Sequence, residues 1–299
     1  MKRGILIYNP RSGSSDTARR IHAIIARATA RDIALEPRET SAPGDATRIV
    51  LDAFAWHPDL IVAAGGDGTI AEVATGLVGS EVPLALLPYG TANVLAREFG
   101  ASADPERALR VLASSRTRPL TAWLTDRRAC FMWVGVGFDA RMIRAAHSRL
   151  KRVLGRVGIG FAGISEFLRY DFPELLIDGV DEKGAAFTRE ATYVVAANIQ
   201  RYGGDMKIAP RADAADDLID LVLFTGRTHV ELARYLFDIG VGAMERGDVA
   251  NVSHVRARSA TIRTKSGKPE HVLIDGDDAG ETPIDIGPIA GHVQVLVPE

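Results

Sequence analysis

The sequence predicts an α/β domain with a parallel, Rossmann-like sheet, followed by a β-rich antiparallel second domain that forms a sandwich or a barrel. Three observations carry this prediction. Apolar runs of strand length alternate with helical patterns over the first ~120 residues. A glycine-rich loop, Gly65 to Thr69, lies between an apolar run and a helical pattern. From about Thr121 onward, short strand-like runs follow one another with turn residues between most of them.

The elements of the first domain are expected to alternate, which implies a parallel sheet covered by helices on both faces. After the first strand, for example, Ile21, Ile24 and Ala28 recur at helical spacing. The expected strands are 5–8, 33–35, 60–64 and 84–87, and the expected helices lie at about 21–28, 43–55, 69–74, 91–99 and 105–112.

The second domain is expected to contain mainly strands, interrupted by helical stretches at 140–170 and 230–245. We predict two domains, 1–121 and 122–299, with the C-terminal tail packing back on the first domain. The expected strands are 122–124, 130–136, 174–177, 192–197, 219–224, 261–263, 271–274 and 293–297.

Composition narrows the possible classes of protein. The chain has 299 residues, enough for two domains, and its net charge of −2 argues against binding to nucleic acid. Cys130 is its single cysteine, which excludes an internal disulfide and a cysteine metal cluster. No apolar run approaches the roughly 20 residues of a spanning helix. We therefore expect a cytoplasmic protein whose membrane contact, if any, is peripheral.

The loop Gly65-Gly66-Asp67-Gly68-Thr69 is the most informative stretch of the chain. A strand, a glycine turn and a helix together point backbone N–H groups and a helix N-terminus toward an anion. A dinucleotide fingerprint would also fit the spacing, but that motif normally follows the first strand and this loop follows the third. The Walker A pattern is absent, and a tight turn without a ligand is the remaining alternative.

Other polar loops follow the apolar runs of the first domain. Asn9, Ser12 and Gly13 follow the first strand, and Gly90 and Thr91 follow the fourth. In a parallel sheet these loops gather with the glycine loop at the carboxyl edge, where ligands bind. Thr91 and Asn93 have a structural alternative, which is to cap the following helix. Asp67 would repel a phosphate directly, so its position suggests a bridging magnesium ion or a hydrogen bond to a ligand hydroxyl.

Several motifs occur in a fixed order along nearly the whole chain, and together they resemble the diacylglycerol kinase catalytic family. The resemblance is greatest to the soluble bacterial lipid kinases related to sphingosine kinases. The family has a nucleotide-binding α/β domain followed by a β-rich lipid domain. The motifs are Asn9-Pro10-Arg11-Ser12-Gly13, 65–69, 87–93, Gly135-Val136-Gly137-Phe138-Asp139, Tyr202-Gly203-Gly204, 216–220 and Asp275-Gly276-Asp277.

The resemblance implies ATP-dependent phosphorylation of a lipid alcohol. It implies that Asp67 acts through magnesium and water, and that Asp277 is the general base. The family usually carries D-G-E where this chain has Asp275-Gly276-Asp277, so the carboxylate of Asp277 is one methylene shorter. A solvated hairpin turn is the alternative interpretation of this dipeptide. The residues implied to contact ATP are Thr40, Gly65, Gly66, Asp67, Gly68, Thr69, Ile70, Ala71 and Thr91.

By the same resemblance, a structural magnesium ion is expected at Asp213, Asp216 and Leu218. Hard oxygen ligands suit magnesium. Asp217 replaces the family's glycine, so a turn with positive φ would be strained there or rebuilt. A surface acidic loop without a metal is the alternative.

The stretch from Ala140 to Tyr170 is basic and amphipathic, with Glu166 as its only acid. Such a segment can dock on an anionic membrane, or it can be a solvated helix packed on its own core. The rival functions are phosphorylation of a soluble substrate, as in NAD kinases, and nucleotide-gated lipid binding without catalysis. The base and the ATP are expected to face each other across an interdomain cleft. The basic residues of the stretch are Arg141, Arg144, Arg149, Lys151, Arg152, Arg156 and Arg169.

Overall fold

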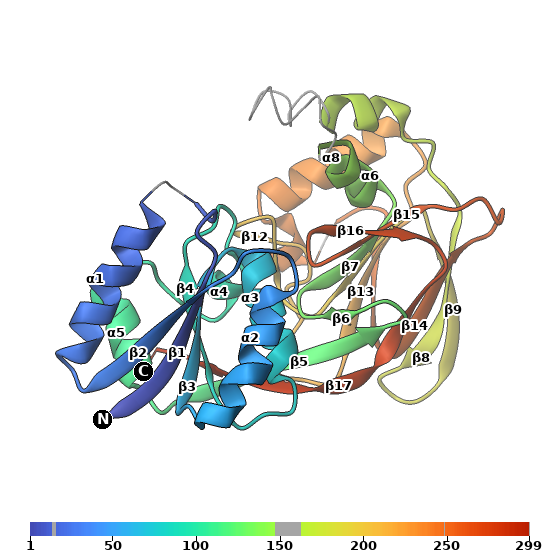
Figure 1. The fold of residues 1–299 in the computed structure, drawn as a ribbon. Helices are drawn as coiled ribbons and strands as arrows, with labels where there is room; N and C mark the ends of the chain where they lie inside the picture. The colour runs from blue at the N-terminus through green and yellow to red at the C-terminus, as the bar shows by residue number, and fades with distance from the viewer. Residues whose placement is uncertain (14–15, 147–162, 248, 299) are drawn as a thin grey trace. The chain divides into compact units, whose positions relative to one another are not determined.

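The structure, a computed structural model, describes residues 1–13, 16–146, 163–247 and 249–298 (Figure 1). The chain divides into two compact units. The first unit consists of Met1–Ala122 together with Arg201–Asp205 and Ala290–Glu299, and the second consists of Trp123–Gln200 and Met206–Ile289. Two short segments from the C-terminal part of the chain therefore belong to the first unit.

The first unit is built on a parallel sheet, as the sequence predicted. Its strands run in the order β4-β3-β1-β2, and each neighbouring pair is parallel. All six residues of β3 are buried, as expected of a strand covered on both faces. Val295, near the end of β17 (Ile284–Leu296), pairs in parallel with Leu84 at the other edge of β4. The strands are β1 (Lys2–Tyr8), β2 (Ile33–Glu39), β3 (Leu60–Gly65) and β4 (Leu84–Pro88).

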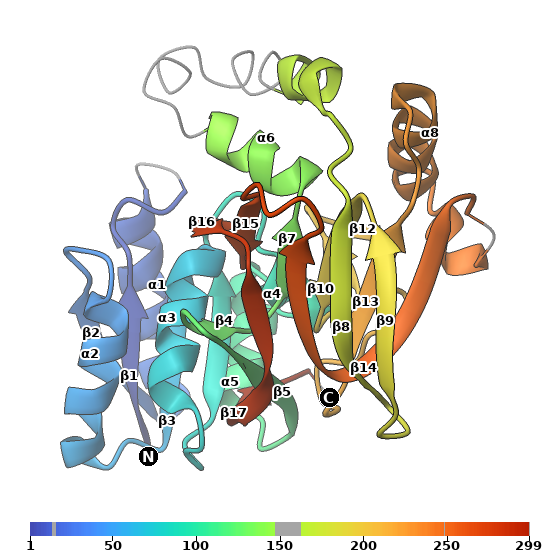
Figure 2. The ribbon, with the colours of Figure 1, turned by 90° about the vertical axis from the view of Figure 1, so that its right-hand side faces the viewer.

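Helices cover both faces of this sheet (Figures 1 and 2). α1 and α5 lie on one face, and α2 and α3 lie on the other. On the first of these faces, Ile21, Ile24 and Leu109 are buried with Leu6 and Leu60 in one hydrophobic core. The helices are α1 (Thr17–Thr29), α2 (Asp45–Ala53) with the 3₁₀ turn η1 (Phe54–Trp56), α3 (Asp67–Leu77), α4 (Val94–Glu98) and α5 (Pro105–Ala113).

The strand order contains a topological switch point. From β1 the chain moves to β2 on one side, and β3 then lies on the other side of β1. In open α/β sheets, ligands bind outside the carboxyl ends of the strands at such a point. The loops that follow β1 and β3 begin at Asn9 and Gly66, so the topology places both predicted loops at this position.

The second unit is antiparallel, which confirms the predicted β-rich domain. Its main sheet runs in the order β16-β15-β7-β10-β13-β14, and β8 and β9 continue from β14. Val134, Val194 and Leu221 are fully buried in its core. The strands are β5 (Thr117–Thr125), which begins in the first unit, β6 (Ala129–Cys130), β7 (Trp133–Val136), β8 (Leu175–Asp181), β9 (Ala186–Ala191), β10 (Tyr193–Ala197), β12 (Met206–Lys207), β13 (Ile219–Phe224), β14 (Val252–Thr264), β15 (His271–Ile274) and β16 (Asp277–Glu281). The short strand β11 (Arg201–Tyr202) belongs to the first unit.

Two differences from the expected strands have physical causes. The single strand expected at 130–136 is divided into β6 and β7, because the N–H groups of Phe131 and Met132 donate to the carboxylate of Asp275. β9 and β16 were not predicted. Their sequences, AFTREA and DDAGE, carry too little apolar alternation to indicate strands, and most of their residues are exposed.

The helices of the second unit are α6 (Phe138–Ala146), the described helical residues 163–169, α8 (His229–Gly240) and the 3₁₀ turn η2 (Ala243–Arg246). α8 begins with a capping box, in which Thr228 accepts from the N–H of Glu231 and Glu231 accepts from the N–H of Thr228. Most of the basic residues expected in the 140–170 stretch, namely Arg149, Lys151, Arg152 and Arg156, lie outside the described residues.

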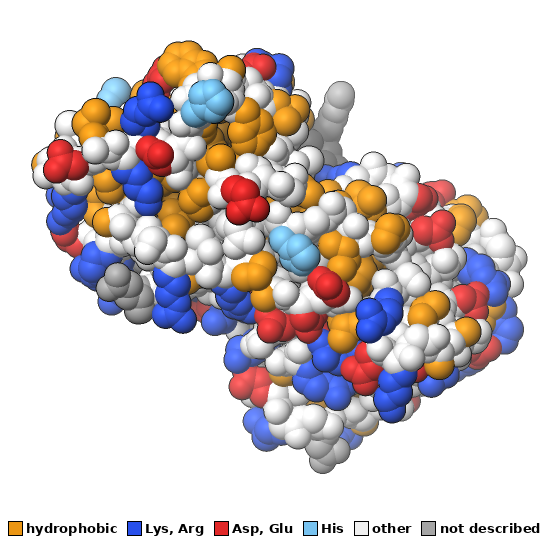
Figure 3. All heavy atoms as spheres, turned by 90° about the horizontal axis from the view of Figure 1, so that it is seen from below, with side chains coloured by type: hydrophobic (Ala, Val, Ile, Leu, Met, Phe, Trp, Pro, Cys, Tyr) orange, Lys and Arg blue, Asp and Glu red, His pale blue; other side chains and the backbone are white. Residues whose placement is uncertain are grey.

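Among the helices of the described ranges, none combines the length and the apolar character that crossing a bilayer requires. Acidic and basic side chains are interspersed on the face shown in Figure 3, in keeping with the small net charge of the chain.

Candidate active site

Three loops meet at the carboxyl edge of the parallel sheet, and backbone hydrogen bonds hold them together. The N–H of Asn9 donates to the carbonyl of Ala64 at 3.3 Å. The N–H groups of Tyr89 and Gly90 both donate to the carbonyl of Gly65, at 3.0 and 3.1 Å. The loops after β1, β3 and β4 therefore form one backbone-lined edge, as the sequence predicted from their positions after apolar strands.

Two glycines of this edge are required by close backbone approach. A Cβ on Gly90 would overlap the Cα of Gly66, so these two loops touch directly. Gly13 has φ +75°, and a Cβ there would overlap the carbonyl oxygen of Tyr89. Gly68 differs, because a Cβ built on it meets nothing within 4 Å. The backbone of Gly68 thus faces open space rather than packing against the protein.

That open space belongs to a cavity of about 290 Å³. Three residues expected to contact ATP line it, namely Thr40, Gly68 and Thr69, together with Asn9 of the loop after β1. Arg11 and Ser41 line it as well, and sequence reasoning did not single them out as site residues. Arg11 lies within the Asn9-to-Gly13 motif, so the motif could have pointed to it. Ser41 is adjacent to Thr40 and has no sequence feature of its own.

Asp67 is held at the beginning of α3 and bonds to a neighbouring helix. Its Oδ1 accepts from the N–H of Leu95 at 3.1 Å, so the carboxylate caps the first turn of α4. Of the two capping candidates, Asn93 is the N-cap residue of α4 but makes no side-chain cap there. Its side chain instead pairs with the N–H and the carbonyl of Gly90. Thr91 is exposed.

The other residues expected to contact ATP have mixed surroundings. Ile70 is fully buried, so only its backbone can face a ligand. Gly65 is also buried, and Ala71 is half-buried. Ser12 lies in the loop after β1, where its carbonyl accepts from the hydroxyl of Thr17. The N-cap residue of α3 is Gly66, which offers no side-chain cap to the first N–H groups of the helix.

In the second unit, Asp275 and Gly276 form the turn between β15 and β16. Both have positive φ, +49° and +89°, which is the conformation of a tight hairpin turn. Asp275 is only 7 % exposed, and its carboxylate accepts from the N–H groups of Phe131, Met132 and Trp133 at 2.9, 2.7 and 3.2 Å. Burial raises the pKa of Asp275 and the backbone donors oppose that rise. This carboxylate is therefore a structural anchor.

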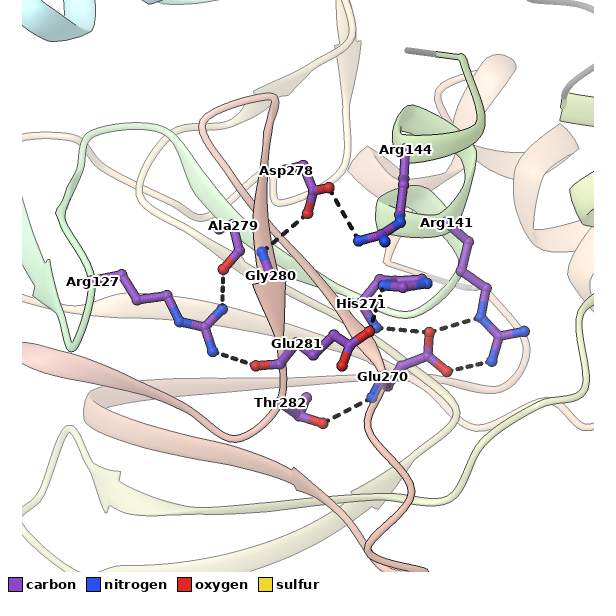
Figure 4. A network of polar contacts seen from close by, with 10 residues as sticks. All are labelled: Arg127, Arg141, Arg144, Glu270, His271, Asp278, Ala279, Gly280, Glu281 and Thr282. Atoms are coloured by element: carbon purple, nitrogen blue, oxygen red, sulfur yellow. Dashed lines mark hydrogen bonds and ion pairs between the residues drawn. The ribbon is translucent and has the colours of Figure 1, made fainter. Parts of the chain in front are cut away.

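Asp277 follows this turn and has a different environment. Its side chain is 59 % exposed, and the nearest basic group is Arg128 Nη1 at 3.6 Å. The adjacent Asp278 pairs with Arg144 at 3.3 Å, as Figure 4 shows. Arg127 donates to the carbonyls of Ala279 and Glu281 on the same strand (Figure 4). The hairpin is thus fixed by arginines, and Asp277 remains accessible.

Arg141, in the basic 140–170 stretch, is mostly buried and is paired within the protein. It forms two hydrogen bonds to Glu270 (Figure 4). It also forms an ion pair with Asp171 at 2.7 Å. The bonds to Glu270 raise its pKa above the ordinary value. Glu270 is itself buried. Arg141 is therefore neutralised by carboxylates of its own chain.

The acidic loop expected to hold a metal is tightly hydrogen-bonded. Oδ1 of Asp216 accepts from the N–H of Leu218 at 3.0 Å, and Oδ2 pairs with Arg256. Oδ1 of Asp213 accepts from the N–H of Ala215 at 3.0 Å. Burial raises the pKa of Asp220 to about 6, although Arg256 lies 3.4 Å away.

Asp217 does not have a positive φ, so the loop is built without the turn that a glycine would permit. Within the described ranges, no three or more His, Cys, Asp and Glu side chains are grouped so as to hold a metal ion. The site expected from Asp213, Asp216 and Leu218 would need backbone carbonyls and water to complete it. That site stays a prediction.

The two units match two protein-family models. Residues 3–123 match the diacylglycerol kinase catalytic domain. Residues 132–297 match the YegS C-terminal NAD kinase beta sandwich-like domain. The chain belongs to the diacylglycerol kinase and YegS-like family of lipid kinases.

Individual relatives agree with this assignment. The chain is 28 % identical to the diacylglycerol kinase of Mycobacterium tuberculosis over 300 residues, which cover 98 % of this chain and 94 % of that protein. It is 30 % identical over 247 residues to the Pseudomonas putida protein named "Probable lipid kinase YegS-like", covering 81 % and 78 %. The crystal structure of a diacylglycerol kinase from Bacillus anthracis has the same fold, with a TM-score of 0.70, 21 % identity and coverage of 99 % and 97 %.

Proposed function

We propose that this lipid kinase transfers a phosphate group from ATP to the primary hydroxyl of diacylglycerol or a related lipid alcohol. The observation that carries the proposal is the meeting of three glycine-containing loops around the open backbone of Gly68, at the switch point of the sheet. In a chain of this family, such an edge suits a triphosphate, because it supplies N–H groups and a helix N-terminus without side-chain obstruction.

The loop edge of the first unit would hold ATP and its magnesium ion. The cavity residues Asn9, Thr40, Gly68 and Thr69 hold the nucleotide, with Ser12, Gly13, Gly90 and Thr91 completing the loop edge. Magnesium, when bound with ATP, neutralises phosphate charge. Asp67 would hold that ion through water, while its Oδ1 keeps the bond from the N–H of Leu95. Tying one oxygen to α4 fixes the position of the other.

Asp277 accepts the proton of the lipid hydroxyl. Two features support it over its neighbour Asp275. Asp277 is exposed, whereas three backbone N–H groups occupy the buried carboxylate of Asp275. A general base must be free to reach the hydroxyl directly or through one water molecule. The proposal includes a structural magnesium ion that would be held by Asp213, Asp216 and the carbonyl of Leu218. It also includes a cytoplasmic location with peripheral contact to the inner face of the membrane.

Release of ADP with different acceptors tests this function. With Mg-ATP, we expect diacylglycerol in mixed micelles to stimulate ADP release and NAD to leave it unchanged. NAD is the second candidate acceptor, because the model matching residues 132–297 is described as NAD kinase-like. Stimulation by NAD alone would replace the lipid proposal. Binding of ATP without any phosphorylated lipid would favour a nucleotide-gated lipid-binding protein.

A further inference from the structure

Arg201–Asp205 is a segment of five residues that belongs to the first unit, although the residues on either side of it belong to the second. It contains Tyr202-Gly203-Gly204, a motif for which the proposed function supplies no role. Gly203 and Gly204 have positive φ, +58° and +101°, so the chain turns sharply within the segment. The turn brings Arg201 and Asp205 toward the same element of the first unit, α4.

Four side chains of alternating charge join the segment to α4. Arg97 Nη1 lies 2.7 Å from Asp205 Oδ2. Arg201 lies 3.6 Å from the other oxygen of Asp205 and 3.7 Å from Glu98. The side chain of Glu98 is only 6 % exposed, so this end of the network is shielded from water. A connected network of this kind holds its geometry better than an isolated surface pair.

Arg97 also contacts the loop that precedes α4. Its Nε donates to the carbonyl of Ala92 at 3.1 Å. Ala92 lies between Thr91 and Asn93, in the loop that touches the glycine loop through Gly90. One guanidinium therefore binds Asp205 with one nitrogen and the proposed phosphate loop with another. The planar fork of arginine suits such a fixed pair of contacts.

We infer that Asp205 is a positioning residue for the nucleotide site. It fixes Arg97, and Arg97 fixes the carbonyl of Ala92, so the Gly90–Asn93 loop is held ready for the phosphates. Asp205 acts through Arg97 and contacts neither ATP nor the lipid. The inference rests on the proposed function in that it assigns this loop to ATP.

The test compares Asp205→Asn, Arg97→Gln and the double variant with Asp52→Asn. Asp52 forms an exposed ion pair with Arg48 at 3.1 Å in the same unit and lies outside the nucleotide site, so it controls for the loss of a surface charge pair. By calorimetry with Mg-ATP, Asp205→Asn should weaken ATP binding about two- to fivefold, and the double variant should be no weaker than the worse single variant. The KM for ATP should rise while kcat and the KM for lipid stay unchanged. Additive effects of the two substitutions, or an unchanged affinity in Asp205→Asn, would overturn the inference.

Hydrogen exchange of the ATP-free protein separates this inference from the proposed function. Asp205→Asn should speed exchange of the amides of Gly90 to Asn93, and Asp52→Asn should not. Unchanged exchange in that loop would refute the positioning role. If the wild-type protein binds no ATP, but Asp205→Asn still speeds exchange in the Gly90–Asn93 loop, the proposed function is refuted. The contact between the Arg201–Asp205 segment and this loop would then still be established.

Discussion

The carboxylate of Asp67 accepts a hydrogen bond from the backbone N–H of Leu95 at 3.1 Å, which links the glycine loop to the start of α4. This bond gives a residue in the middle of a phosphate-type loop a structural partner of its own. The bond uses Oδ1 of the carboxylate. The bond also separates two roles of Asp67 that substitution can test independently, because asparagine keeps an acceptor oxygen and loses the charge.

Asp67→Asn should therefore fold normally and lose most of its turnover. The amide oxygen can still accept from Leu95, so we expect the melting temperature to stay close to that of the wild type. Turnover of Mg-ATP and lipid should fall, because the charge that organises magnesium is lost. A variant that retains more than about half of wild-type activity would contradict this role.

Gly68 and Gly90 form a matched pair for testing the loop edge. Gly90→Ala places a methyl group against Gly66 and should destabilise the fold, by roughly 1–3 kcal/mol in urea unfolding. Gly68→Ala meets no protein atom and should unfold like the wild type, while weakening ATP binding because the methyl group enters the ligand space. Unaltered ATP affinity in Gly68→Ala would place the nucleotide elsewhere.

Asp277→Asn should lower turnover by roughly 10²–10⁴-fold and leave ATP affinity nearly unchanged. Asp277→Glu restores the residue that the family usually carries and should keep substantial activity with a changed fit to the lipid. Asp278→Asn is the matched control, because Asp278 is adjacent and pairs with Arg144. Equal losses in Asp277→Asn and Asp278→Asn would remove the specific role of Asp277 as the base.

Asp275→Ala should destabilise the protein rather than act on catalysis alone. It leaves the N–H groups of Phe131, Met132 and Trp133 without their acceptor in a buried region. Losing a charged acceptor of this kind costs about 3 kcal/mol or more in the free energy of unfolding. Chemical denaturation measures this cost directly. A loss below about 1 kcal/mol would mean that water replaces the carboxylate.

Much of the fold could be predicted because its main features are local. The buried strand β3 consists of continuous apolar residues, and β13 is apolar except for Asp220. The hairpin turn at Asp275-Gly276 has the composition that such turns need. The loop edge could also be predicted locally, because the glycines at 66, 68 and 90 follow apolar runs of strand length. The parallel sheet of the first unit and the antiparallel second unit were predicted from the order of apolar runs and helical patterns, whereas the strand order comes from the structure.

The features that could not be predicted from the sequence depend on contacts between residues far apart in the chain. The bond from Asp67 to Leu95 and the contact of Arg97 with Asp205 join positions 28 and 108 residues apart, and no local pattern encodes them. The burial of Asp275 beside an exposed Asp277 could not be read from two aspartates on one turn. The pairing of Arg141 with Glu270 likewise joins residues 129 positions apart, and the basic pattern of residues 140–170 gave no sign of it.

The central claim is that the acceptor of the phosphate group is a lipid alcohol, and a phosphorylation screen of a total lipid extract tests it most directly. The protein is incubated with Mg-ATP and the extract, and the products are identified by mass, with Asp277→Asn as the parallel control. The account predicts one or more lipids heavier by a single phosphate group, diacylglycerol among them or a related lipid alcohol, that are absent in the control. No phosphorylated lipid, together with a phosphorylated soluble metabolite in a matched aqueous extract, would contradict it.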